Sequence, residues 1–173
     1  DPVPDFISFE AALAAFERQG AAVLVPHPEF MNVSLTRAEV GAYRDRVDAV
    51  ETYNAKLFDH QNDHGRRLAE AFDIPGFGSS YAHLRGTVGA AWTEFDGDVG
   101  GEDALVRALK KGTPRSVVKR HDPATRLRRV VEFSHLGYEN SWRKLDRLLL
   151  SGMEATHPRH IAYEGRFDDV AVY

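Results

Sequence analysis

The chain has 173 residues, 43% of them hydrophobic and 28% charged, which is the length and composition of one globular domain with a substantial core. It contains no cysteine, so thiol nucleophiles, thiolate metal sites and disulfides are excluded, and we expect a cytoplasmic protein. No apolar run approaches the roughly 20 residues that cross a bilayer, and the first ten residues lack the layout of a signal peptide, so we expect no membrane insertion.

The net charge of −4 conceals an uneven distribution along the chain. Residues 107–129 carry nine of the 22 basic side chains and a single acidic one, Asp122, whereas the remainder is acidic. A basic segment on an acidic body suggests an anionic ligand such as a phosphate. A solvated helix face is the alternative interpretation.

Capping residues and apolar spacing predict alternating helices and strands. Ser8 precedes an amphipathic pattern that ends at Gly20, so we expect a helix between them. The apolar run 21–25 has the length of a strand, and Thr36 with Glu39 forms a capping box that begins the next helix. Further strands are expected at 48–52, within 76–86, at 87–95 and at 115–120, and further helices at 64–72, 102–111, 123–134 and 139–150. This alternation predicts an α/β fold with parallel strands.

Imidazole is the only soft metal ligand that this cysteine-free chain offers. His27 and His83 each follow a predicted strand, at the end where parallel α/β folds build their sites, so we expect them to converge. A hydrogen-bonding loop residue is the alternative for each. His60 and His64 have the spacing of an ion-chelating pair on one helix face, although their neighbours favour an ordinary helix start.

Four segments follow one another in a characteristic order: AAVLVPHPEF, DAVETYNAKL, FGSSYAHLRGTVGAAWTEF and, after a helix, RSVVKR. Together they resemble the later part of the PHP (polymerase and histidinol phosphatase) domain family. In that family a strand ends in a His-Pro pair, the next ends in an acidic residue near a Tyr-Asn, and a third leads to a Gly-Ser-Asp-x-His signature. The resemblance covers residues 20–120. It implies a distorted seven-stranded β/α barrel that holds up to three divalent ions, commonly zinc, manganese or iron, and hydrolyses phosphoesters.

Carried over to this chain, the resemblance makes His27 the metal ligand of the His-Pro pair and His83 the last residue of the signature. Tyr81 stands where the signature has its aspartate, so a phenol replaces a hard anionic ligand. We keep Tyr81 as a third candidate ligand, at a position where metal binding is weakened.

Four polar side chains are candidates for contact with the substrate or its phosphate. Asn54 belongs, with Glu51, to a segment that shapes the site in the family, and an ordinary strand-to-helix turn is the alternative. Arg85 follows the signature in the same loop, and Lys119 and Arg120 end a predicted strand. A basic residue at these places could neutralise a phosphate oxygen, and surface salt bridges are the alternative.

The opening His-x-His pair of the family has no counterpart, because no two histidines here are separated by a single residue. A complete three-ion site therefore cannot be built from this chain alone, and half a barrel would expose two sheet edges. We expect a fragment whose missing N-terminal barrel half is supplied by another segment, or a homo-oligomer. Residues 1–120 are then the C-terminal part of the barrel, and residues 121–173 are a helical extension packed on the same domain.

The leading hypothesis is a metal-dependent phosphoesterase in which a metal-activated water attacks a phosphorylated small molecule, a nucleotide or an oligonucleotide. The first alternative is a degenerate domain of the same type that has lost full metal binding through Tyr81 and serves binding or regulation. The second is a nucleic-acid-binding α/β domain that uses residues 107–129, whose affinity would fall steeply with salt.

Overall fold

The computed structural model describes Val3, residues 7–30, 34–82 and 85–120, and six single positions between 130 and 141. The chain divides into two compact units, residues 1–21 with 135–173 and residues 22–134. The helices predicted beyond residue 122 lie almost entirely outside the described residues, and the division expected at residue 120 stays a prediction. No described helix is long and apolar enough to span a membrane.

Helix α1 (Phe9–Arg18), in the first unit, confirms the first predicted helix. The hydroxyl of Ser8 caps it by accepting the backbone N–H of Ala11 at 3.2 Å. The chain leaves the helix through Gly20, whose φ of +68° lies in the left-handed region that glycine adopts without strain.

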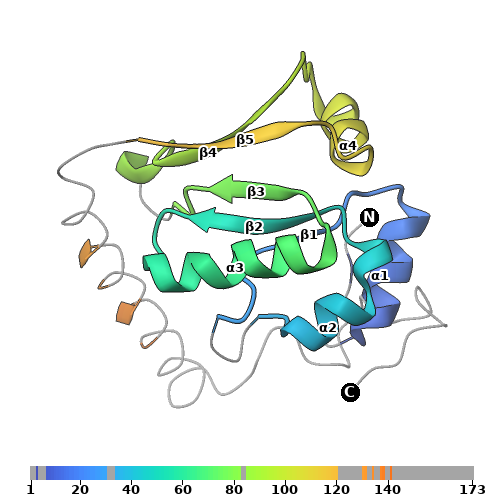
Figure 1. Cartoon of the computed structure of the whole chain (residues 1–173), viewed down its shortest axis with the longest axis horizontal. Helices are drawn as coiled ribbons and strands as arrows, with labels where there is room; N and C mark the ends of the chain where they lie inside the picture. Colours follow the sequence, from blue (N-terminus) through green and yellow to red (C-terminus); the bar gives the residue numbers. More distant parts are fainter. Residues whose placement is uncertain are drawn as a thin grey trace, which may run out of the picture. The chain divides into compact units, whose positions relative to one another are not determined.

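Three parallel strands form the sheet of the second unit, in the order β1 (Leu24–Val25), β2 (Ala49–Asn54) and β3 (Gly76–Ser79). Helix α2 (Arg37–Ala42) connects the first two strands, and α3 (Asp59–Phe72) connects the second and third (Figure 1). The predicted α/β fold with parallel strands alternating with helices is thus confirmed for this part of the chain. Strand β1 is shorter than the predicted run 21–25.

The core of this unit lies where α2 and α3 pack on the sheet, and it consists of Val25, Val40, Val47, Val50, Leu68, Ala69 and Ile74. Helix α3 approaches β2 so closely that a Cβ on Gly65 would lie 2.2 Å from the carbonyl oxygen of Glu51. The helix begins five residues before its predicted start at residue 64. The helix begins earlier because the side chain of Gln61 accepts the backbone N–H of Phe58 at 2.9 Å and so caps the first turn.

Strands β4 (Ala91–Phe95) and β5 (Arg115–Lys119) pair antiparallel, so the prediction of parallel strands is wrong here. A parallel pair requires the connecting helix to run back alongside the sheet. Here α4 (Glu102–Lys110) lies beyond the ends of both strands, so the chain re-enters β5 in the opposite direction (Figure 1). Strand β4 also begins later than predicted, because residues 85–87 form a 3₁₀ turn.

Side chains join β3 to this second sheet. The Thr93 hydroxyl accepts the N–H of Gly78 at 2.9 Å and donates to its carbonyl at 3.1 Å. The Ser80 hydroxyl donates to the carbonyl of Ala91 at 2.8 Å. A Cβ on Gly78 would lie 2.3 Å from Cγ1 of Val117, so only glycine permits this approach. In the described residues the two sheets remain separate and no closed barrel is seen.

Candidate functional site

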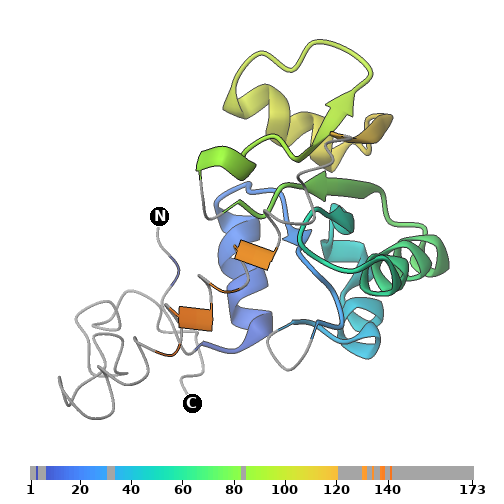
Figure 2. The ribbon, with the colours of Figure 1, turned by 90° about the vertical axis from the view of Figure 1, so that its left-hand side faces the viewer.

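The candidate site lies at the edge of the β1–β3 sheet where all three strands end. Figure 2 turns this edge toward the viewer. Because the strands are parallel, their carboxyl ends bring the residues that follow them to the same edge, as expected for α/β folds.

The carboxylate of Glu51 connects the three strand ends. It is only 4% exposed. Its Oε2 accepts the backbone N–H of His27 at 2.7 Å and the side-chain amide of Asn54 at 3.1 Å, and its Oε1 accepts the hydroxyl of Ser79. A buried carboxylate is costly unless donors satisfy it, and here each of the three strands supplies one. Glu51 therefore shapes the site, as the sequence suggested.

The backbone and ring of His27 are both fixed by neighbours. The backbone has a φ of +31°, in the left-handed region, and its N–H is held by Glu51. The ring nitrogen Nδ1 lies 2.6 Å from the hydroxyl of Ser34. Since Nδ1 is engaged, Nε2 is the ring nitrogen left to a metal ion or a substrate.

Tyr81, the third candidate ligand, lies beside His27. The two rings meet edge to face with their centroids 5.5 Å apart. Tyr81 also has a positive φ, +46°, and its side chain is 38% exposed. His83, the second predicted metal ligand, lies outside the described residues.

Lys56 is a member of the site that the sequence interpretation missed. Its side chain is 1% exposed, and its Nζ lies 4.9 Å from the centre of the Tyr81 ring, a cation–π contact. The backbone N–H of Lys56 donates to Oδ1 of Asn54 at 3.0 Å, which places the residue just after the end of β2. The available signal was a lysine two residues after the Tyr-Asn pair, inside a predicted strand-to-helix turn.

Asn54 is buried in a network that shapes this turn. Its N–H donates to Oδ1 of Asn62 at 2.8 Å, and Nδ2 of Asn62 donates back to the Asn54 carbonyl at 3.2 Å. With its own side chain bound to Glu51 and to the N–H of Lys56, Asn54 connects β2 to α3. Its assignment to substrate contact stays a prediction.

The three basic candidates for phosphate binding occupy exposed positions. Lys119 ends β5, where its Nζ lies 5.1 Å from the centre of the Tyr53 ring, and Arg120 follows it. Arg85 begins the 3₁₀ turn before β4. The structure thus brings Lys119 to Tyr53 and His27 to Tyr81. Phosphate binding by Arg85, Lys119 and Arg120 stays a prediction.

The described residues fit only part of a metal site. Among them no group of three or more histidine, aspartate and glutamate side chains could hold an ion. His27 offers one ligand through Nε2, whereas Glu51 already accepts three hydrogen bonds and the ammonium of Lys56 repels a cation nearby.

Comparison with known proteins supports the relation that the motifs suggested. The crystal structure of PsfC from Pseudomonas syringae PB-5123 is similar to this chain, with a TM-score of 0.53 and 21% identity over 79% of this chain and 55% of PsfC. The chain therefore spans about half the length of PsfC, and at this identity the likeness shows the fold alone. No curated protein matches the chain. Residues 59–114, which run from α3 to the loop before β5, match the PHP-associated family, so the predicted relation to PHP proteins is confirmed for this segment.

Proposed function

We propose that this chain forms part of a metal-dependent phosphoesterase of the PHP type and contributes His27, Tyr81 and Lys56 to its site. The observation that carries the proposal is their convergence at the carboxyl edge of the parallel sheet, where Glu51 fixes the loop of His27. The match of residues 59–114 to the PHP-associated family supports it.

In this proposal His27 holds a metal ion through Nε2. A bound zinc, manganese or iron ion supplies a water of lowered pKa and stabilises charge on the phosphoryl oxygens. The remaining ligands, for up to three ions, come from outside the described residues, His83 among them, or from a second polypeptide.

The other residues of the site supply position and charge. Glu51 keeps His27 in its left-handed conformation, and Ser34 fixes the ring through Nδ1. Lys56 lies against the partly exposed ring of Tyr81 and contributes a positive charge at the edge that also holds the carboxylate of Glu51. A buried charge acts through a medium of low dielectric constant, so it attracts a phosphate more strongly than a solvated lysine does.

We also propose that the described strands form part of a distorted barrel. In this arrangement β1, an edge strand, pairs with strands of an N-terminal barrel half or of a second copy of the chain. Pairing would satisfy backbone groups that an open edge leaves to solvent.

A binding or regulatory domain that holds a phosphorylated ligand without cleaving it is the second candidate function. Lys56 favours it, because an ammonium beside Tyr81 opposes the entry of several metal ions while it attracts an anion. The three hydrogen bonds accepted by Glu51 favour it as well, because they leave little of this carboxylate for a metal.

Metal analysis combined with a hydrolysis assay tests the proposal. The full-length protein would be analysed for bound metal by plasma mass spectrometry beside its His27→Ala variant, with Glu70→Ala, an exposed change on α3, as a control outside the site. Activity toward phosphomonoesters and cyclic phosphodiesters would be measured with zinc, manganese and iron. We expect metal content and activity to fall in His27→Ala alone. If the protein binds phosphoesters but holds no metal and hydrolyses nothing, the second candidate function is established. If it neither binds nor hydrolyses phosphoesters, both candidate functions are wrong.

A further inference from the structure

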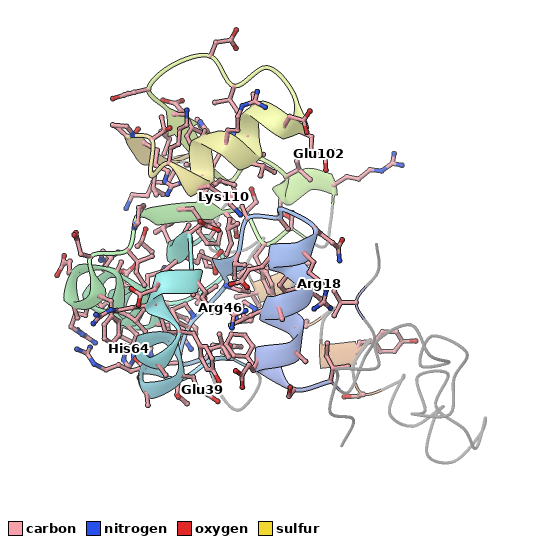
Figure 3. The ribbon with its side chains drawn as sticks, turned by 90° about the vertical axis from the view of Figure 1, so that its right-hand side faces the viewer. Arg18, Glu39, Arg46, His64, Glu102 and Lys110 are labelled. Atoms are coloured by element: carbon pink, nitrogen blue, oxygen red, sulfur yellow. The ribbon has the colours of Figure 1, made fainter. Side chains whose placement is uncertain are left out.

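A cleft of about 210 Å³ lies between the loop after β1 and the first turns of α3. Its lining residues are Pro28, Glu29, Phe30, His60, Gln61 and His64. Figure 3 labels His64 on α3. The cleft lies within the second unit of the chain, and the function proposed above does not use it.

The cleft offers flat ring faces to a ligand. The ring of His60 stacks on that of Phe58, with centroids 6.0 Å apart and planes inclined by 7°, so its plane is fixed. Phe30 contributes a second ring, which contacts the ring of His27 at a centroid distance of 5.9 Å. Planar heteroaromatic rings stack on such side chains in nucleotide-binding proteins.

The polar atoms of the cleft suit the hydrogen-bonding edge of a nucleobase. Oε2 of Glu29 lies 3.3 Å from Nδ1 of His64, so an acceptor and an imidazole stand side by side. Oε1 of Gln61 accepts the N–H of Phe58, which leaves its amide nitrogen as a donor. A carboxylate and an amide donor together match the alternating donors and acceptors of a base edge.

A metal ion explains these residues less well. His60 and His64 have chelating spacing, but His60 stacks on Phe58 whereas His64 contacts Glu29. Within the described part of the chain no three-ligand group exists. The aromatic faces would also have no role in a metal site.

The cleft adjoins the candidate site through His27. This residue directly precedes the loop that forms one wall, and its ring contacts Phe30 in the cleft and Tyr81 in the site. The His27 ring thus contacts a residue of each place, and a ligand with its ring in the cleft would direct its charged group toward this residue.

We infer that the cleft binds the nucleobase of a nucleotide whose phosphate lies at the candidate site. The phosphate part of this inference rests on the proposed function, and the base part does not. The substrate or ligand class is then a nucleoside monophosphate or one of its esters.

Chemical-shift mapping by two-dimensional ¹H–¹⁵N NMR tests the two parts separately. Adenosine and cytidine, which lack phosphate, probe the cleft alone, and inorganic phosphate and ribose 5-phosphate probe the candidate site alone. AMP and CMP probe both. We expect the nucleosides to shift the amide resonances of residues 29–30 and 60–64, and the nucleotides to bind at least tenfold more tightly than ribose 5-phosphate.

Two variants and a matched control make the test specific. Phe30→Leu removes a stacking face, so we expect about tenfold weaker nucleoside binding and unchanged phosphate binding. Glu29→Gln should alter the preference between adenosine and cytidine. Trp92→Leu removes an aromatic ring that is 38% exposed on β4, and should change nothing.

The outcomes separate the inference from the function. If nucleosides bind but phosphate and ribose 5-phosphate do not, the cleft binds the base and the proposal that phosphate binds at the candidate site is wrong. If ribose 5-phosphate binds as tightly as AMP and CMP, the cleft does not bind the base and the inference is wrong. The proposed phosphoester function would still stand. Nucleosides that leave the amide resonances of residues 29–30 and 60–64 unshifted in the wild type would also overturn the inference, whether or not the variants fold.

Discussion

The carboxylate of Glu51 accepts the backbone N–H of His27 at 2.7 Å, although 24 residues separate them in the chain. This bond joins the buried end of β2 to a loop residue whose φ is positive, at +31°. A left-handed conformation costs free energy in a residue other than glycine, and it persists only when its surroundings fix it. Glu51 is therefore both a positioning residue for His27 and a stabilising one for the sheet edge.

Replacing Glu51 by alanine should destabilise the protein strongly. The change leaves the N–H of His27, the amide of Asn54 and the hydroxyl of Ser79 without their acceptor. Each unsatisfied buried group costs roughly 1–3 kcal/mol, so we expect a loss of about 3 kcal/mol or more in the free energy of unfolding. Urea unfolding followed by circular dichroism measures it. Glu70→Ala, an exposed change on α3, should stay within about 0.5 kcal/mol. A loss below about 1 kcal/mol in Glu51→Ala would show that water replaces the carboxylate.

Replacing Lys56 by methionine should separate stability from anion binding. Methionine keeps about the length of the buried side chain, and removes its charge and its cation–π contact with the Tyr81 ring. A phosphate about 8 Å from the ammonium would gain about 2 kcal/mol at an effective dielectric constant near 20, so removing the charge should weaken phosphate binding by about thirtyfold. Calorimetric titration with inorganic phosphate measures this, beside urea unfolding.

The control for Lys56→Met is Lys111→Met, which removes the same charge from an exposed position after α4. Equal losses of phosphate affinity in the two variants would mean that net charge, and not the position of Lys56, attracts the anion.

Gly65→Ala should destabilise the protein although alanine is the better helix former. In an ordinary helix interior the change gains roughly 0.5–1 kcal/mol. Here the new Cβ would lie 2.2 Å from the carbonyl oxygen of Glu51, a backbone atom that moves only with β2. We expect a net loss of about 1–3 kcal/mol, measured by thermal and urea unfolding. Gly86→Ala is the matched control, because a Cβ there meets nothing within 4 Å. Equal effects of the two changes would disprove the close approach of α3 to β2.

Local sequence signals predicted the elements whose causes lie within a few residues. Ser8 and Thr36 cap the helices that follow them, as their spacing indicated. The convergence of His27 and His83 was expected from a general property of parallel sheets, in which strand ends share one edge, and it stays a prediction. The structure places the ring of Tyr81, two residues before His83, against that of His27.

Other features depend on contacts that no short pattern contains. The antiparallel direction of β5 depends on where α4 lies relative to the strand ends, and a helix of the same sequence could have crossed back alongside the sheet. From the sequence alone, Lys56 would be expected at the surface. The residue that covers it, Tyr81, comes 25 positions later in the chain. Strand-end position singled out His27 and the family resemblance singled out Tyr81 as candidates, whereas Lys56 required the structure.

The capping box of α2 should make the stability of this helix depend on pH. Both the backbone N–H and the hydroxyl of Thr36 donate to Oε2 of Glu39 at 2.7 Å, and Figure 3 labels Glu39 at the start of α2. These bonds, the backbone one first, hold the pKa of Glu39 below its usual value of 4.5. The pKa of Glu39 is thus lower in the folded than in the unfolded state. The capping box therefore stabilises the helix fully when the pH is above the pKa of the unfolded state. This stabilisation is lost as the pH falls through the pKa of the folded state.

Carboxyl-detected NMR titration of Glu39 in the wild type and in Thr36→Ala tests this dependence. The variant loses the hydroxyl and keeps the backbone N–H, so the pKa of Glu39 should rise part of the way toward 4.5. The difference in stability between wild type and variant should accordingly narrow as the pH falls below that value. If Glu39 titrates at the same pH in both proteins, the hydroxyl of Thr36 does not bind the carboxylate in solution, and any remaining shift comes from the backbone N–H alone.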